Sequence, residues 1–356
     1  MNAASVLTRA RALQRLVQDH AREGHLPYLR QMYEMAVLKL RHGIGVNYYQ
    51  TAGFFRQDIP WNDKAAHLGA GDFVRRLDRL NPPPYRKLSQ HKLAEKALLT
   101  LLRIPTPEYL GYVHRLAGRT STGLPLRTLN EFERFIDEVT CDRLCFKLIE
   151  GHGGAGFVAV ERRRTAAGVR LAPLFESSEV TVPAFFERYI APAASGRLVE
   201  AYLEQHPSYQ AFNPTSVNTL RVWAYAEPGE PGKILGAYLR IGRAGVLVDN
   251  HVAGGLVAPV DDVTGILRAA VDGLPTHRVH PVHPDSGVPI EGVRLEFWRE
   301  AMELAATTLT VFPKTRLAGL DIAVGTSGPS VIELNNYPGL DGVGVSNLQL
   351  AKLLKD

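Results

Sequence analysis

The first quarter of the chain repeats apolar residues at steps of three and four positions. The apolar set in SVLTRARALQRLVQ is Val6, Leu7, Ala10, Leu13, Leu16 and Val17. The stretch PYLRQMYEMAVLKL continues this period, which places apolar side chains on one face of an α-helix. The run Asn81-Pro82-Pro83-Pro84 stops it. We therefore predict a mostly helical N-terminal region over residues 1–85.

A second amphipathic helix is predicted over residues 89–103, ending at Pro105 and Pro107 in IPTPEY. Short runs rich in β-branched and aromatic residues then predict strands. These runs are RLCFKLIE, GFVAVER, LRVWAYAE, KILGAYLRIG, VLVDN, LAGLDIAV and VIELNN. In the stretch EGVRLEFWREAMELAATTLTVF the apolar residues again have helical spacing, which predicts a helix. The order predicts an α+β chain with a helical front and a largely antiparallel body.

Length and composition restrict the class of protein. A chain of 356 residues is long for one hydrophobic core and predicts two or three lobes. No apolar run reaches the roughly 18 residues of a membrane span, and the N-terminus lacks the apolar core of a secretory signal. We expect a cytoplasmic protein without membrane insertion. Three arginines before the first acid, Asp19, leave a mitochondrial transit peptide as the alternative.

The formal net charge is +5, and the basic excess is scattered apart from short clusters such as Arg162–Arg164. This distribution favours anionic small ligands over nucleic acid. The two cysteines, Cys141 and Cys145, form neither a disulfide framework nor a zinc-binding set, and a reducing cytosol fits them. The pattern leaves the oligomeric state open.

The stretch GHGGAG, residues 151–156, matches the spacing G-x-G-x-x-G. A dinucleotide fingerprint requires a helix after the glycines, but FVAVE follows and is typical of a strand. No Gly-Lys-Ser/Thr closes a Walker A loop. The pattern favours a loop between two antiparallel strands, whose bare N–H groups can approach phosphate oxygens. We expect His152 to follow the turn geometry and not to act as a general base.

Lys147 stands in the strand before these glycines. It shares a face with Cys145 and Ile149 and so interrupts an apolar row. One interpretation is a cation directed at phosphate. The alternative is a lysine on an edge strand that discourages aggregation.

Acidic residues come together near the C-terminus, in GLDIAVGTSGPSVIELNNYPG. Glu333 and Asn335 are two apart on one predicted strand and share a face. If residues 326–330 form the hairpin loop, Asp321 lies opposite Asn335 on that same face. Two carboxylates and an amide oxygen suit Mg²⁺ that also binds substrate phosphates. The alternative is the polar outer face of a sheet.

Taken together, the glycine hairpin with its preceding lysine and the late Asp…Glu-x-Asn resemble the ATP-grasp superfamily, and within it the sugar-transfer-associated ATP-grasp family. The segments that carry the resemblance are SQHKLAEKALL…IPTPEY, FKLIEGHGGAGF, VEAYLEQHPSYQAFNPTSVNTLRV, LRIGRAGVLVDNHVAGGLVAPV, GLDIAV and VIELNNYPGLD. They cover residues 90–342, and YYQTAGFFRQDI from Tyr48 resembles the family's front segment. The resemblance implies two α+β lobes that clasp ATP: residues 86–200 with the glycine hairpin, and the catalytic lobe 201–356 with the metal site.

The resemblance also implies ATP and Mg²⁺ as cofactors and a role for each motif position. The residues it places around the nucleotide are Lys92, Lys147, Gly151, Gly153, Gly154, Gly156, Glu200, Ala201, Tyr202, Leu203 and Glu204. The lysines would contact phosphates, the glycines would cover them, and residues 200–203 would form the hinge that meets adenine. Glu204 stands in EQHP where the superfamily usually has a Gly-x-Glu-like context, so the ribose ligand stays open.

Asp321, Glu333 and Asn335 would hold Mg²⁺, and Arg221 and Arg240 would be the catalytic cations on the transferring phosphoryl group. From the residues alone, the arginines could equally form cross-strand ion pairs on a solvated face. Arg243 in GRAG is equally typical of a turn.

Candidate substrate contacts are Asn218, Asp249, Asn250, His251 and Gly254. Four of these lie in VDNHVAGG, where polar tips before paired glycines suit a substrate-facing loop, with an Asp-Asn turn as the alternative. His277, His280 and His283 stand among prolines without a completing zinc pattern, which favours a solvated or substrate-lid loop. The helical front does not match the βαβ domain of many ATP-grasp ligases, so the acceptor site cannot be carried over.

Three functions remain open at this point. The first is an ATP- and Mg²⁺-dependent ligase that joins a carboxylate to an amine through an acyl phosphate, in making or decorating a glycan or secondary metabolite. The second is a kinase that phosphorylates a small-molecule hydroxyl from the same ATP site. The third is a non-catalytic nucleotide-binding module.

Overall fold

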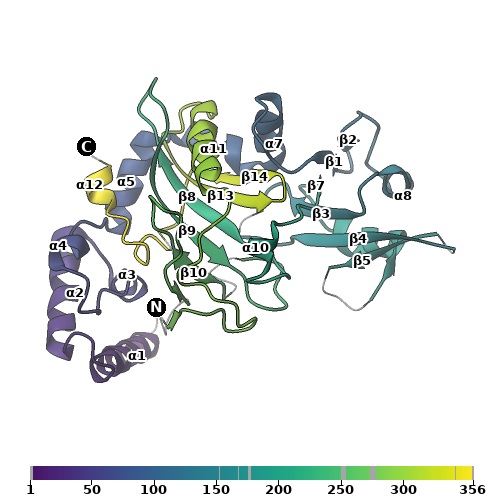
Figure 1. Cartoon of the computed structure of the whole chain (residues 1–356). Helices are drawn as coiled ribbons and strands as arrows, with labels where there is room; N and C mark the ends of the chain where they lie inside the picture. Colours follow the sequence, from purple (N-terminus) through teal and green to yellow (C-terminus); the bar gives the residue numbers. More distant parts are fainter. Residues whose placement is uncertain are drawn as a thin grey trace.

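The computed structural model describes residues 3–151, 153–166, 168–174, 178–249, 254–272, 278–340 and 342–354, without the side chains of 3–7 and 9. Within these residues the chain forms a helical front and two seven-stranded sheets. Figure 1 shows the front helices beside the second sheet, on the side away from the first sheet. The predicted α+β class is confirmed.

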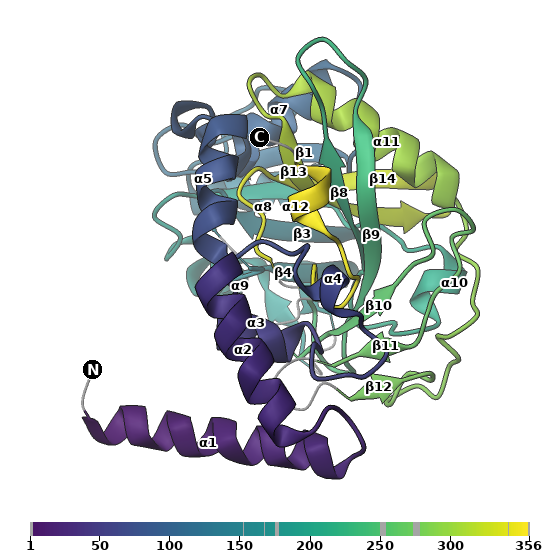
Figure 2. The same cartoon turned by 90° about the vertical axis from the view of Figure 1, so that its left-hand side faces the viewer.

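The front consists of helices with a small core of their own. These helices are α1 (Ala3–Arg22), α2 (Tyr28–His42), α3 (Val46–Thr51), α4 (Trp61–Lys64) and α5 (Ala70–Leu80). Val17, Leu38 and Phe54 are fully buried where α1, α2 and the end of α3 meet. Helix α1 extends away from the body (Figure 2). None of the described helices combines the length and hydropathy that crossing a membrane requires.

The first sheet has the strand order β2-β1-β7-β3-β4-β5-β6, with antiparallel neighbours. Its strands are β1 (Tyr109–Val113), β2 (Arg119–Thr120), β3 (Arg143–Leu148), β4 (Val158–Thr165), β5 (Gly168–Pro173), β6 (Val180–Thr181) and β7 (Arg197–Ala201). The helical elements that cover one face are α8 (Leu129–Glu138), α9 (Val182–Phe185) and η2 (Phe186–Ile190). Strand β3 lies between β7 and β4, so the interpretation of Lys147 as an edge-strand lysine is wrong.

Successive side chains of β3 point to opposite faces of the sheet, which determines which of them are buried against the helices and which point away from them. Leu144 and Phe146 are fully buried beneath the covering helices, while Cys145 and Lys147 point to the opposite face. Helix α8 begins at a capping box, in which Thr128 and Glu131 each satisfy the other's backbone N–H. The first sheet thus has one apolar face against helices and one face toward the second sheet.

The second sheet has the order β12-β11-β10-β9-β8-β13-β14 and is also antiparallel. Its strands are β8 (Thr219–Tyr225), β9 (Lys233–Ile241), β10 (Leu256–Pro259), β11 (Ala270–Val271), β12 (Val279–His280), β13 (Leu317–Gly325) and β14 (Gly328–Asn335). The helices that follow or flank it are α10 (Pro207–Gln210), α11 (Trp298–Val311) and α12 (Leu350–Leu353). The prediction of a strand at VLVDN is wrong, because residues 246–249 form no strand.

The two faces of this sheet differ in chemistry. Leu220, Val222 and Leu320 point into a large core that α11 covers. Trp223 and Leu317 point to the other face and pack with α5 and the C-terminal segment. Further along that second face the alternating positions become charged. The polar positions predicted for an outer face therefore lie opposite the first sheet, and not in solvent.

The edge strand β14 is covered by the helical segment between the two sheets. This segment contains η1 (Pro83–Tyr85), α6 (Lys87–Gln90) and α7 (Lys92–Leu101). The N–H of Val331 donates to Pro105 O at 2.8 Å, and the N–H of Leu334 donates to Glu95 Oε1 at 2.5 Å. These bonds satisfy backbone groups that an open edge would expose. Helix α7 thus packs on the second sheet, although the boundaries at residues 85 and 200 stay a prediction.

The β13–β14 hairpin has a different register from the predicted one. Gly325 pairs with Gly328, so the loop is shorter than the expected 326–330. A β-bulge lies next to Asp321, which pairs with Glu333 and not with Asn335. The difference at Asp321 is two residues, an even number, so its side chain stays on the face shared with Glu333 and Asn335.

Candidate active site

A cavity of about 380 Å³ lies between the free face of the first sheet and the polar part of the second. Most of the nucleotide, metal and catalytic residues predicted from the sequence line it. They are Lys92, Lys147, Gly151, Gly153, Gly154, Glu200, Ala201, Tyr202, Leu203, Arg221, Arg240, Asp321, Glu333 and Asn335, together with the candidate substrate residue Asp249. Segments more than 200 residues apart in the chain therefore meet at one cavity.

Glu200 lies at the centre of the first-sheet wall. It stands opposite Cys145 in the β3–β7 ladder, and Lys147 is its diagonal neighbour on the same face. Lys147 Nζ lies 2.5 Å from Glu200 Oε2. Burial by itself raises the pKa of Glu200, but Lys147 and Lys96 outweigh it and lower that pKa. Glu200 is therefore a buried carboxylate that its lysine partners hold ionised.

The second-sheet wall carries two arginines around one aspartate. Arg221 and Asp321 are direct cross-strand partners, and Arg221 Nε donates to Asp321 Oδ1 at 2.5 Å while Nη2 donates to Oδ2 at 3.2 Å. Arg240 Nη2 lies 2.8 Å from Asp321 Oδ2. Burial opposes ionisation of Asp321, but the two guanidinium groups outweigh it and lower its pKa. Cross-strand pairing does occur here, at the cavity and not on a solvated face.

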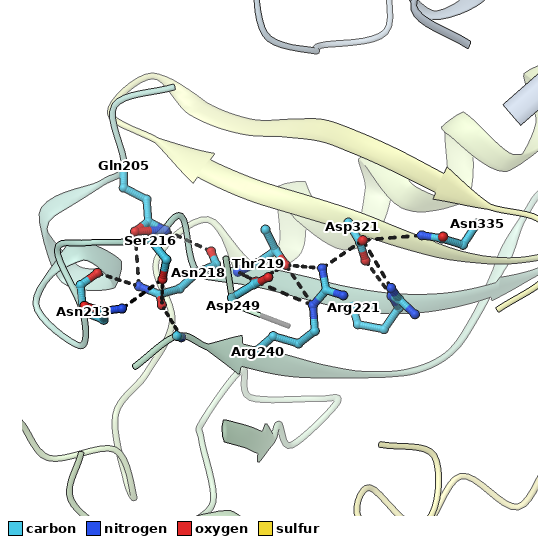
Figure 3. Close-up of polar contacts among 11 residues, drawn as sticks. Gln205, Asn213, Ser216, Asn218, Thr219, Arg221, Arg240, Asp249, Asp321 and Asn335 are labelled. Atoms are coloured by element: carbon cyan, nitrogen blue, oxygen red, sulfur yellow. Dashed lines mark hydrogen bonds and ion pairs between the residues drawn. The ribbon is translucent and has the colours of Figure 1, made fainter. Parts of the chain in front are cut away.

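The network extends from Arg240 to Asp249, as Figure 3 shows. Asp249 Oδ2 accepts hydrogen bonds from the N–H and hydroxyl of Thr219, and it lies 3.6 Å from Arg240 Nε. Arg240 Nη2 also donates to Thr219 Oγ1 at 2.7 Å. Burial raises the pKa of Asp249, and Arg240 partly offsets that rise. Asp249 thus orients Arg240 from the wall of the cavity, which an isolated Asp-Asn turn would not do.

Lys92 meets the acidic hairpin. Its Nζ lies 2.9 Å from Glu333 Oε2, and both side chains line the cavity. Glu95 lies one turn further along α7 and holds the backbone next to Glu333, as described above. Burial and the charge of Glu333 raise the pKa of Glu95 to about 8. The start of α7 thus positions the strand that carries the proposed metal ligands.

The chemistry of this donor set fits Mg²⁺. Asp321 and Glu333 are paired across neighbouring strands, and Asn335 Nδ2 lies 3.4 Å from Asp321 Oδ2. Among the described residues, no three His, Cys, Asp or Glu side chains form a cluster that could hold a metal. The donor types of Asp321, Glu333 and Asn335, two carboxylates and one amide, are those that Mg²⁺ takes when phosphates and water supply its remaining ligands.

The glycine loop connects β3 and β4, as predicted, and its conformation depends on glycine. Gly153, Gly154 and Gly156 have positive φ angles of 60°, 75° and 67°, which other residues rarely adopt. A Cβ atom on Gly154 would lie 2.8 Å from Val248 Cγ1. The hairpin of the first sheet therefore touches the segment after β9 of the second, and the glycines allow this close approach over the cavity. His152 lies outside the described residues.

Several predicted contacts lie elsewhere. Gly156, Glu204 and Gly254 do not line the cavity. The side chain of Glu204 is 72% exposed and lies 3.8 Å from Arg143. Its assignment to the ribose stays a prediction. Asn250 and His251 lie outside the described residues.

Asn218 is a buried structural residue and not a substrate contact. Its amide donates to Gln205 Oε1 and Asn213 O (Figure 3) and to Tyr209 O. Its oxygen accepts from the N–H of Gly242. These hydrogen bonds engage both the nitrogen and the oxygen of the Asn218 amide, and Asn218 does not line the cavity. The sequence pattern did not reveal them because the partners lie in a short helix, in irregular segments and just after a strand, where periodicity gives no signal.

The histidine-rich loop is also structural where it is described. His283 is buried, and its Nε2 lies 3.0 Å from Gly242 O. Arg243 forms two hydrogen bonds with Asp285, at 2.6 and 2.7 Å. These contacts fasten the loop to the turn after β9. His283 itself is therefore not solvated, although most of its described neighbours in the loop are exposed, as predicted. The role of a substrate lid stays a prediction. His277 lies outside the described residues.

Sequence reasoning missed Lys96, Glu95, Thr219 and Tyr238. Tyr238 and Thr219 line the cavity, and Lys96 lies behind Glu200. A signal for two of them was present, because Lys92, Glu95 and Lys96 have the spacing i, i+3, i+4 and share one helix face. Periodicity gave no reason to assign that face to the cavity.

Comparisons with known proteins were made for the whole chain. Among solved structures, D-alanyl-alanine synthetase A from Vibrio cholerae is 14% identical, with 75% of this chain and 62% of that chain covered and a TM-score of 0.40. L-amino acid ligase from Bacillus licheniformis is 11% identical, with 85% and 51% covered and a TM-score of 0.42. Biotin carboxylase from Campylobacter jejuni is 12% identical, with 80% and 51% covered and a TM-score of 0.46. This chain therefore spans 51–62% of these three chains.

No curated protein matches the chain. The family described as sugar-transfer associated ATP-grasp matches residues 74–354, which include both sheets and every cavity residue named above. The segment from Tyr48 that resembles the family's front lies before the matched residues. Since the match extends over more than half of the sequence, the chain belongs to the sugar-transfer associated ATP-grasp family.

Proposed function

We propose that the protein is an ATP- and Mg²⁺-dependent ligase that joins a carboxylate to an amine through an acyl phosphate. The observation that carries this proposal is the composition of the cavity of about 380 Å³ between the sheets. Lys147 and a glycine hairpin from one wall face Lys92, two arginines and an oxygen-rich hairpin from the other. This is the set of groups that phosphoryl transfer to a carboxylate requires, since positioning and charge neutralisation supply most of the rate.

The nucleotide would occupy the first-sheet side of the cavity. Lys147 and Lys92 supply point charges for phosphates, and the glycine hairpin supplies backbone N–H groups above them. The strand end 200–203 supplies backbone groups for adenine. Asp321, Glu333 and Asn335 would hold Mg²⁺, which neutralises and bridges phosphate oxygens when bound.

The arginines would act on the reacting groups. Arg221 and Arg240 present planar guanidinium groups, which suit a carboxylate or a phosphoryl group. In this structure both are aligned by Asp321, and Arg240 also by Asp249 and Thr219. Preoriented cations of this kind lower the cost of charge that develops during transfer. An amine that attacks the acyl phosphate would complete the reaction, with release of ADP and phosphate.

The family's association with sugar transfer supports a substrate in glycan biosynthesis, and a secondary metabolite is the other class we propose. The identity of the carboxylate and of the amine is the open question. The helical front precedes the family match, and Tyr48 from that front approaches Tyr238, which lines the cavity. The front therefore lies close to a residue of the cavity wall, and we propose that it helps to form the site for the amine.

The test is an untargeted reaction screen. Purified protein is incubated with Mg-ATP and panels of carboxylates and amines, and products are identified by mass. A ligase gives ADP and phosphate only when a carboxylate and an amine are both present, together with a product that has lost one water. A stable phosphorylated product formed without an amine would instead establish a kinase. Tight Mg-ATP binding without turnover across the panel would establish a nucleotide-binding module.

A further inference from the structure

Glu200 is shared between two lysines from different parts of the fold. Lys147 on β3 lies 2.5 Å from one carboxylate oxygen, and Lys96 on α7 contacts the other. Glu200 is only 1% exposed and Lys96 only 4% exposed. Because the cluster is shielded from water, its charges interact strongly and are weakly screened by salt.

Lys96 cannot bind a ligand directly in this arrangement. Its Nζ donates to Thr106 Oγ1 at 2.5 Å and to Pro107 O at 2.9 Å, in addition to its contact with Glu200. These two hydrogen bonds and the ion pair hold the ammonium group of Lys96 at the base of α7 and direct it away from the cavity. Lys147, in contrast, lines the cavity, whereas Lys96 lies behind its wall.

The charges of the cluster explain why a second lysine matters. Two ammonium groups and one carboxylate leave a net charge of +1, whereas Lys147 and Glu200 alone would be neutral. Burial lowers the pKa of Lys96, but Glu200 opposes that effect. Burial also works against the charge of Lys147, yet Glu200 outweighs it and raises the pKa of Lys147.

We propose that Lys96 is a positioning residue for the triphosphate: by pairing with Glu200 from behind the wall, it offsets the charge of that carboxylate, so that Glu200 does not cancel the charge that Lys147 presents to the cavity. This inference rests on the proposed function, because it takes the cavity as the ATP site. Lys96 also ties α7, which covers the metal-binding strand, to the strand end that would meet adenine. The same contact therefore fixes the distance between the two walls.

The test measures Mg-ATP and adenosine binding by isothermal titration calorimetry for the wild type, Lys96→Met and Lys96→Arg. We expect Lys96→Met to weaken Mg-ATP binding by about tenfold or more, the effect of removing one nearby unit charge in a poorly screened site. Adenosine lacks phosphates, so its affinity should change less than about threefold. Lys96→Arg keeps the charge and should stay close to wild type. Lys39→Met, at an exposed position on α2, changes the total charge equally and should change neither affinity.

A second measurement of Mg-ATP binding uses the double variant Lys96→Met/Glu200→Gln. It returns the cluster to a net charge of +1, so it should bind Mg-ATP more tightly than Lys96→Met. Thermal unfolding of each variant shows that the folded protein is compared. An equal loss of adenosine and Mg-ATP affinity would show a merely structural role and overturn the inference. So would wild-type Mg-ATP affinity in Lys96→Met. A wild-type protein that binds no Mg-ATP would instead refute the proposed function itself.

Discussion

Glu333 differs from the other carboxylates of the cavity in its exposure. Its side chain is 31% exposed, and its partner Lys92 is 16% exposed, whereas Asp321 and Glu200 are almost completely buried. A partly exposed pair of this kind contributes only about 1 kcal/mol to folding. Glu333 can therefore be replaced without loss of the fold, which makes it the suitable position for testing the metal assignment.

We predict that Glu333→Ala removes the Mg²⁺ dependence of ATP binding and lowers turnover by roughly 10²–10³, while the unfolding temperature changes little. ATP affinity measured with and without Mg²⁺ gives the readout. Glu227→Ala is the control, since Glu227 is an ion-paired glutamate that lies outside the cavity and belongs to none of the predicted sites. Equal Mg²⁺ dependence in Glu333→Ala and wild type would remove Glu333 from the metal site.

The buried Glu200 leads to a prediction about pH. Its pKa lies below the ordinary value of 4.5 in the folded protein, because its lysine partners outweigh the effect of burial. The unfolded chain therefore binds more protons near pH 4, and the stabilisation is present above pH 4.5 and lost as pH falls through the folded pKa. We expect the free energy of unfolding to fall less steeply below pH 4.5 in Glu200→Gln than in wild type. Urea unfolding at several pH values measures the slopes, and parallel slopes would contradict the assignment.

At the scale of elements, the glycine hairpin depends on glycine for two reasons: its backbone has positive φ angles, and it lies close to the second sheet. Gly154 and Gly245 have nearly equal φ angles, 75° and 78°, but their surroundings differ. A Cβ on Gly154 would lie 2.8 Å from Val248, while a Cβ on Gly245 would meet nothing within 4 Å. Alanine at either position carries a similar backbone strain of about 1 kcal/mol. Only alanine at Gly154 also displaces the hairpin from the opposite wall.

We therefore predict that Gly154→Ala weakens Mg-ATP binding several-fold, about 3–10-fold, whereas Gly245→Ala leaves it within about twofold. Binding calorimetry on both variants checks this difference, and thermal unfolding should show similar small losses of stability. If both variants bind Mg-ATP equally, the hairpin does not act as a cover over the nucleotide.

On the scale of the whole molecule, Asn81 joins the front to the second sheet. Its amide donates to Leu317 O and Asn336 O, both at 2.6 Å, and its oxygen accepts from the N–H groups of Arg316 and Leu317. Asn81 ends α5, and its partners lie at the start of β13 and just after β14. One buried side chain thus satisfies four backbone groups at the junction.

We expect Asn81→Ala to destabilise the protein by roughly 3 kcal/mol, because the four backbone groups would remain buried without partners. Asn130→Ala, at an exposed position on α8, is the control and should change stability by less than about 0.5 kcal/mol. Urea unfolding followed by tryptophan fluorescence is a suitable measurement, since Trp223 packs beside α5. A loss below 1 kcal/mol in Asn81→Ala would show that water replaces the lost bonds.

A second connection joins the front to the end of the chain. Tyr48 Oη lies 2.8 Å from His67 Nδ1, and His67 Nε2 lies 3.1 Å from Asn347 Oδ1. Burial lowers the pKa of His67, which favours its neutral form. The segment after β14 is thereby held between the front helices and Tyr238, since Gly342 stands against the Tyr238 ring. The front is part of the structure that supports the cavity.

Local pattern was enough to predict several elements and to place residues on their faces. The period of three and four identified the front helices, and alternation placed Lys147 on the same face of β3 as Cys145, where the structure has it. Alternation also placed Asp321, Glu333 and Asn335 on one face, and this survived a register error because the error was an even number of residues. The glycine loop followed from the strand-like sequence after it. Each of these conclusions depends on the geometry of a single strand, helix or hairpin.

The tertiary structure alone decided what covers each face. Periodicity does not show that β3 is a central strand, that Lys96 reaches Glu200, or that Asp249 orients Arg240, because these contacts join elements distant in sequence. For the same reason Asn218 and His283 looked available to ligands but are buried against irregular segments. The sequence by itself determined which groups each element presents, since backbone geometry is local. Their partners depend on the packing of two sheets and a helical front, which no local pattern encodes.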